Sequence, residues 1–166
     1  RPPRSTLFPY TTLFRSAAYA HIKDAINLEP QTSAYQAQLG EFLASYGKNL
    51  VEQNIISQEK KDAEMLSAFK TASEIESADI DFLVRYAQAF YDVQSPDLGR
   101  AQELWQKAES LAPLGFEKDE MRLNLARVFI MKKDFPQALE TLNKINTPKY
   151  FSARDALKKK IEKTEK

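Results

Sequence analysis

The sequence predicts an all-α fold built from consecutive helix–turn–helix pairs and closed by a C-terminal capping helix. Apolar residues recur at helical spacing along most of the chain, whereas strand patterns are nearly absent. The few glycines are scattered, and prolines gather at the expected helix boundaries. Four anchor positions, Ala25, Ala72, Ala108 and Ile145, occur in similar helices, and the last two intervals are 36 and 37 residues. Such a period is typical of a helical repeat array.

The first sixteen residues, RPPRSTLFPYTTLFRS, look like a standard high-throughput sequencing adapter translated in frame. Codons of such an adapter encode Arg1 to Ser16 without a gap, so we interpret residues 1–16 as non-native rather than as a Pro- and Thr-rich tail. They contribute three arginines and no acid, so the net charge changes from +1 for the whole chain to −2 for Ala17–Lys166.

Residues 17–31 then form a partial first repeat, which keeps only its second helix. Its partner helix would lie upstream, so its apolar face would be partly uncovered. Adapter-derived apolar residues could cover that face by accident, as collapse rather than as native packing: Leu7, Phe8, Tyr10, Leu13 and Phe14.

The second repeat, residues 32–77, begins its first helix after Thr32 or Ser33 and contains an unusually long connection. Apolar residues continue through that connection, which predicts that both helices extend and that most of Leu50–Met65 is helical. We expect the reversal near Ser57–Lys61. Two alternatives are a loose loop and a protruding hairpin tip that contacts a partner.

The third repeat covers residues 78–113, and its second helix spans Ser95–Pro113. Ser95 is a candidate N-cap and Pro96 suits the first helical position. Small residues on either side of Trp105 would let a neighbouring helix approach while the indole fills the gap. Pro113 and the following Gly115 end this helix.

The fourth repeat covers residues 114–149. Asp134 is the candidate cap of its second helix and Pro148 its stop. Residues 150–166 form the capping helix, whose expected start is a capping box of Ser152 and Asp155. A polar terminal helix of this kind keeps a repeat array soluble.

This pattern resembles the tetratricopeptide repeat (TPR) family. In the family motif the first helix has a large residue, a leucine followed by a small residue, and a tyrosine. The second helix carries alanines around a large residue, and a proline closes the unit. The third repeat matches best, at Leu83, Tyr86, Ala87, Phe90, Ala101, Trp105, Ala108 and Pro113. The resemblance extends over nearly all of residues 17–150 and implies a right-handed α-solenoid with a concave groove.

The chemistry of the sequence indicates neither an enzyme nor a cofactor-binding protein. There is no cysteine, His21 is the single histidine, and no glycine-rich phosphate loop is present. No segment reaches the uninterrupted apolar length of a membrane span. The C-terminal run KKKIEKTEK could be read as a nucleic-acid tail, but its interleaved acids argue against nucleic acid as a partner. We therefore expect no metal, no cofactor and no direct membrane contact.

The resemblance implies a non-enzymatic scaffold that binds a peptide or partner protein in its groove. The implied contact positions are Ala37, Glu41, Arg85, Gln88, Tyr91, Asn124 and Arg127. Ala37 and Glu41 stand where carboxylate-binding members of the family have lysine and asparagine, which argues against recognition of a C-terminal carboxylate. Arg85 and Arg127 could attract an acidic segment.

Three alternatives to partner binding in the groove remain open. The chain could be the C-terminal scaffold of a larger enzyme or envelope-assembly factor whose active domain lies upstream. It could be a spacer with an empty groove. It could also self-associate through the uncovered edge at residues 17–30.

Overall fold

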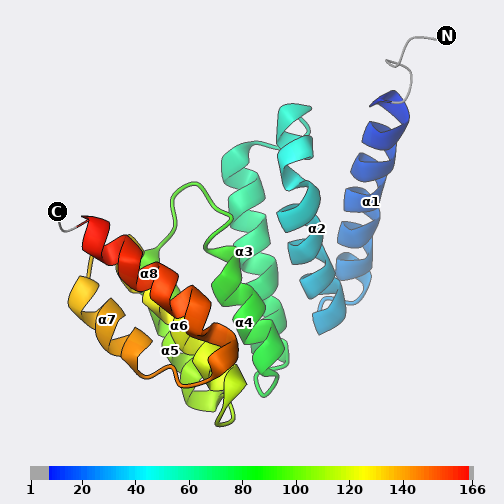
Figure 1. The fold of residues 1–166 in the computed structure, drawn as a ribbon. Helices are drawn as coiled ribbons and strands as arrows, with labels where there is room; N and C mark the ends of the chain where they lie inside the picture. The colour runs from blue at the N-terminus through cyan, green and yellow to red at the C-terminus, as the bar shows by residue number, and fades with distance from the viewer. Residues whose placement is uncertain (1–7, 165–166) are drawn as a thin grey trace. The chain divides into compact units, whose positions relative to one another are not determined.

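The computed structural model describes residues 8–164, with side chains from residue 13 onward, and its described part contains eight α-helices, one 3-10 turn and no strand (Figure 1). This confirms the predicted all-α class. The chain divides into two compact units, unit 1 up to Gln94 and unit 2 from Ser95. Within each unit, helices that follow one another in sequence pack together. The division falls inside the expected third repeat, so the stacking of a continuous solenoid stays a prediction.

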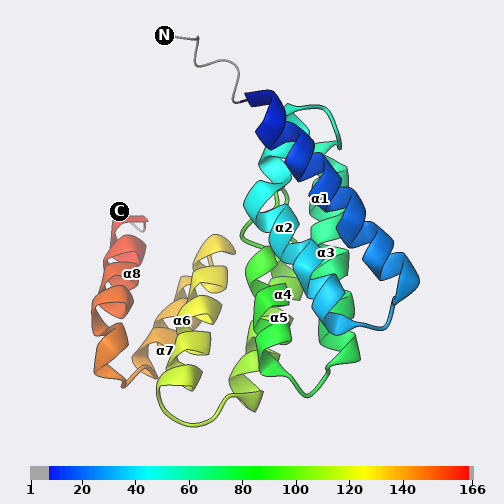
Figure 2. The ribbon, with the colours of Figure 1, turned by 90° about the vertical axis from the view of Figure 1, so that its right-hand side faces the viewer.

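Unit 1 consists of α1 (Phe8–Leu28), α2 (Ser33–Glu52), α3 (Gln58–Ile75) and α4 (Ile80–Ala89). Helix α2 packs against both α1 and α3, and α3 packs against α4; Figures 1 and 2 show α1 alongside α2. The most deeply buried side chains of these helices are Leu43, Leu50, Met65, Phe69, Ala72 and Ala87. Helix α2 begins at Ser33 after Thr32, as the sequence predicted.

The long α2–α3 hairpin confirms the extended helices and excludes a loose loop. Leu50 is fully buried near the end of α2, and Ile56 is buried in the turn. The reversal, however, occupies residues 53–57 and not Ser57–Lys61, because the Ser57 hydroxyl accepts a hydrogen bond from the Lys60 backbone N–H (3.1 Å) and so caps α3 at its first turn.

Helix α1 runs from Phe8 through the residues interpreted as adapter-derived without a break at Ala17. Leu13 and Phe14 are 64% and 73% exposed, so these two residues do not cover the apolar face of the helix. Leu7 and the side chains of Phe8 and Tyr10 lie outside the described residues. The buried face of α1 is formed instead by Tyr19 and Ile22.

Unit 2 consists of α5 (Leu98–Leu111), α6 (Phe116–Met131), α7 (Phe135–Asn143), the 3-10 turn η2 (Pro148–Tyr150) and α8 (Phe151–Thr164). Helix α6 packs against α5 and α7, and α8 packs against α6 and α7. Trp105 is fully buried between the equally buried Ala101 and Ala108, as predicted. Helix α8 buries Ile161 against this unit, and its role as the cap of a repeat array stays a prediction.

Three helix boundaries in unit 2 differ from the sequence prediction. Helix α5 is capped by Asp97, whose carboxylate accepts from the Arg100 N–H at 2.9 Å, and not by Ser95. Helix α7 ends at Asn143, and Pro148 opens η2 rather than stopping α7. Since η2 leads directly into α8, Ser152 lies inside the first turn of that helix and forms no capping box. The predicted Asp134 cap of α7 is confirmed, with a bond of 3.3 Å from the Gln137 N–H.

Candidate functional site

Three of the expected contact residues of unit 1, Glu41, Arg85 and Gln88, meet where α2 and α4 both lie against α3. Gly40 of α2 leaves room for the ring of Phe69, since a Cβ at Gly40 would lie only 2.7 Å from a ring atom. Phe69 is 1% exposed. On α4, the guanidinium carbon of Arg85 lies 5.6 Å from the centre of the same ring. The phenyl ring thus supports the arginine by a cation–π contact.

Arg85 joins α2 to α4 through hydrogen bonds that fix its orientation. Its Nε and Nη2 donate to the two carboxylate oxygens of Glu41, and its Nη1 donates to Gln88 Oε1 at 2.7 Å. A two-point pair of this kind orients a guanidinium far better than a single contact does. We define Glu41, Arg85 and Gln88 as the α2–α4 polar cluster.

The α2–α4 polar cluster is ordered yet accessible. The side chains of Arg85 and Glu41 are 41% and 44% exposed. Arg85 has five N–H groups, three of which are used in these bonds, so two remain for another molecule. At this exposure the ion pair contributes only about 0–1 kcal/mol to stability, so its main consequence is orientation.

The other expected contact residues are placed less favourably. Ala37 lies one turn before Glu41 on α2 and is half-buried, and Tyr91 follows the end of α4 and is also half-buried. In unit 2, Asn124 is only 7% exposed and donates to the Glu120 carbonyl at 3.1 Å. Arg127 is exposed and donates to Asn124 Oδ1 at 2.8 Å. Of the expected contact residues, unit 2 therefore contributes a single exposed cation, whereas unit 1 contributes a three-residue cluster.

Sequence reasoning missed Phe69 as the support of Arg85 and Asp81 as its neighbour. Asp81 is exposed and lies one turn before Arg85 on the same face of α4. The signal for Phe69 was present, because the small Gly40 at a helix crossing predicts a large side chain opposite it.

Two buried charges in the described chain have structural partners and offer no reactive group. In unit 1, Lys61 Nζ donates to Asp62 Oδ1 (2.9 Å) and to the Asp92 carbonyl (2.7 Å). In unit 2, Asp119 accepts from the backbone N–H groups of Asn146 and Thr147 at 3.0 and 2.8 Å. Burial alone would raise the pKa of the Asp119 carboxyl, but hydrogen bonds from the Thr147 hydroxyl, from these two backbone N–H groups and from Arg122 hold that pKa below its ordinary value.

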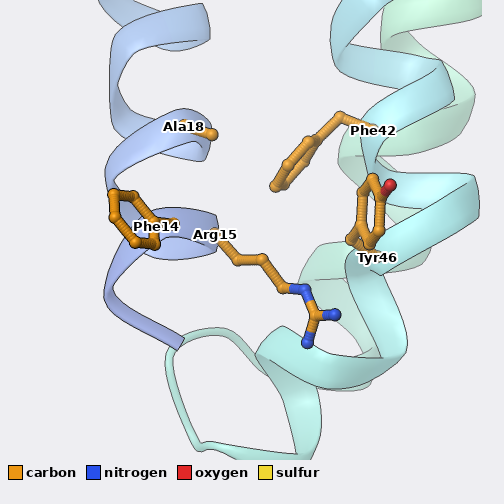
Figure 3. Close-up of a pocket in the computed structure, with 5 residues that line it drawn as sticks. All are labelled: Phe14, Arg15, Ala18, Phe42 and Tyr46. Atoms are coloured by element: carbon orange, nitrogen blue, oxygen red, sulfur yellow. The ribbon is translucent and has the colours of Figure 1, made fainter. Parts of the chain in front are cut away.

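A cavity of about 320 Å³ opens between α1 and α2 (Figure 3). It is lined by Phe14, Arg15, Ala18, Phe42 and Tyr46, and Arg15 lies 5.4 Å from the centre of the Tyr46 ring. Phe14 and Arg15 belong to the segment interpreted as adapter-derived. The cavity is therefore shaped in part by residues to which we assign no function.

Neither a group of metal-binding side chains nor a membrane-spanning helix is found in residues 8–164. His21 is exposed, and no group of three or more His, Cys, Asp or Glu residues in this range could hold a metal ion. None of the helices described here is long and apolar enough to cross a membrane.

Comparison with known proteins finds no family model that matches the chain, and no curated protein matches it either.

Proposed function

We propose that this chain is a non-enzymatic interaction module of the TPR type, which binds a peptide or partner protein through the α2–α4 face of unit 1. The observation that carries the proposal is the polar cluster, in which a half-exposed arginine is held in one orientation with two N–H groups unused. An oriented arginine suits recognition, because little side-chain entropy is lost when a partner binds.

The finer architecture is part of the proposal. Small residues at helix crossings, such as Gly40 against Phe69, favour closely packed helix pairs. The α2–α3 and α6–α7 pairs pack within their own units, which supports a stack of TPR-like repeats. In such a stack the first helix of each pair lines the binding surface, and α2 and α4, which carry the cluster, are the first helices of the second and third expected repeats.

Selection from a random peptide library displayed on phage, followed by binding measurements in solution, tests this function. We expect the immobilised chain to enrich peptides and Arg85→Ala to weaken their binding about tenfold, as for an interface arginine. Arg100→Ala is the matched control, because Arg100 is 45% exposed and pairs with Glu103 on α5. The proposal fails if no peptide is enriched over the bare support, or if Arg85→Ala binds as well as Arg100→Ala does.

A further inference from the structure

The two units carry charges of opposite sign. From Ala17 to Gln94, unit 1 has 6 basic and 12 acidic residues, a formal net charge of −6. The three arginines of the first sixteen residues change this value only to −3. Unit 2 has 15 basic and 11 acidic residues, a net charge of +4. The chain's net charge near zero therefore conceals a strongly acidic unit on which the polar cluster lies.

The residues around the polar cluster are also acidic, like unit 1 as a whole. Glu41 neutralises Arg85 through a two-point ion pair, and the exposed Asp81 lies one turn away on α4. The nearest lysine further along α2 is Lys48, two turns after Glu41, and Glu52 lies 3.8 Å from its Nζ. Arg85 consequently acts as a hydrogen-bond donor in an acidic field and not as an isolated positive charge.

We infer that the partner of unit 1 is a basic peptide segment, which places a backbone carbonyl on Arg85 and a lysine or arginine side chain beside Glu41 and Asp81. This inference rests on the proposed function. It reverses the expectation that Arg85 attracts an acidic segment, because an acidic segment would have to displace Glu41 and approach Asp81.

The hydrogen-bonding capacity of the cluster fits such a segment. A carboxylate has about four lone-pair positions, and Arg85 occupies two of those on Glu41, so a second cation can bind to the half-exposed remainder. The two unused N–H groups of Arg85 match a peptide carbonyl, which carries no net charge. Long-range attraction by unit 1 would then steer the basic segment to the cluster and raise its association rate.

The experiment measures the net charge of the peptides that the complete 166-residue chain enriches from a random library. We expect enriched peptides to be more basic than the unselected library, and their binding to weaken as salt is added. Glu41→Gln, which removes the negative charge and one of the two acceptors of Arg85, should weaken the binding of these basic peptides about two- to fivefold. Glu103→Gln, which removes the acid of the exposed Arg100–Glu103 pair, is the control and should leave binding unchanged.

The outcomes separate this inference from the proposed function. The enriched peptides could be neutral or acidic and still bind Arg85→Ala more weakly than the parent. That result overturns the basic-partner inference and leaves the proposed interaction module in place. Basic peptides that bind equally to the parent and to Glu41→Gln also overturn it. A selection that enriches nothing contradicts the proposed function itself.

Discussion

Asp119 holds the irregular segment between α7 and α8, and its replacement by alanine should weaken unit 2 severely. Its side chain is 4% exposed, and its Oδ2 accepts from Asn146 N, Thr147 N and Thr147 Oγ1 at 3.0, 2.8 and 2.7 Å. Its Oδ1 accepts from Arg122 Nη1 at 2.9 Å. The alanine variant leaves four donors without their acceptor.

The loss of stability in Asp119→Ala depends on which other partners each of the four donors can find. A hydrogen bond to a charged group contributes about 1.5–3 kcal/mol, so four bonds set an upper limit that is several times larger. Asn146 is exposed and Thr147 half-exposed, so water replaces part of the loss. Arg122 keeps Glu109 at 2.8 Å and the Lys144 carbonyl at 3.0 Å. We expect a net loss of about 3 kcal/mol in the free energy of unfolding, near the cost of breaking a buried ion pair.

Fluorescence of Trp105 during denaturant unfolding measures this loss in the correct unit. Trp105 is the single tryptophan of the chain and is fully buried in α5, so it reports on unit 2 alone. The midpoint for Asp119→Ala should fall without a change in slope. Asp155→Ala is the control, because Asp155 is an exposed acid that pairs with Arg154 at 2.8 Å, and its midpoint should match that of the parent.

Acid titration provides the second half of the test. The folded pKa of Asp119 lies below its unfolded value of about 3.9, so the stability it contributes is complete above that value and is lost as the pH falls through the folded pKa. Below about pH 4 the parent should therefore lose its advantage over Asp119→Asn. A stability difference between parent and Asp119→Ala under about 1 kcal/mol, or one that persists unchanged in acid, would refute this account.

Two further predictions concern unit 1. In Gly40→Ala, the greater helix propensity of alanine stabilises α2 by about 1 kcal/mol, but overpacking against the buried Phe69 ring costs about 1–3 kcal/mol. Amide exchange in α3 should therefore accelerate. Unchanged exchange would show that the ring can move aside. In Lys61→Met the bond to the Asp92 carbonyl is lost, so amide exchange should accelerate at residues 92–94 and not in α2. Equal acceleration in α2 would contradict a local role for Lys61.

Helix positions and the apolar core were predictable because they depend on residues close together in sequence. The spacing of Ala101, Trp105 and Ala108 put all three on one face of a single helix, and all three are buried. Ser57 and Asp97 show why boundaries were harder. Each is one of several side chains able to accept from a free N–H at a helix start, and the path of the chain decides which one does.

The candidate site was predictable only in part. The repeat resemblance selected Glu41, Arg85 and Gln88 individually, but not their mutual bonds. Arg85 and Glu41 are separated by 44 residues and meet only because α2 and α4 each pack on α3. The ion pair changes what Arg85 can bind, because Glu41 already neutralises the arginine that was expected to attract an acidic segment.

The apolar periodicity of the helices did not identify the buried charged residues. Lys61 lies in the run EKKDAE, which reads as a solvated helix face, yet its side chain packs over Gly47, where a Cβ would lie 2.8 Å from Lys61 Cγ. Its ammonium group, like the Asp119 carboxylate in unit 2, binds backbone groups of an irregular segment that no helix satisfies. Each unit thus contains a charged residue that is buried because a non-helical connection needs a partner. Apolar periodicity cannot reveal such residues, since their partners lie 27 to 31 positions away.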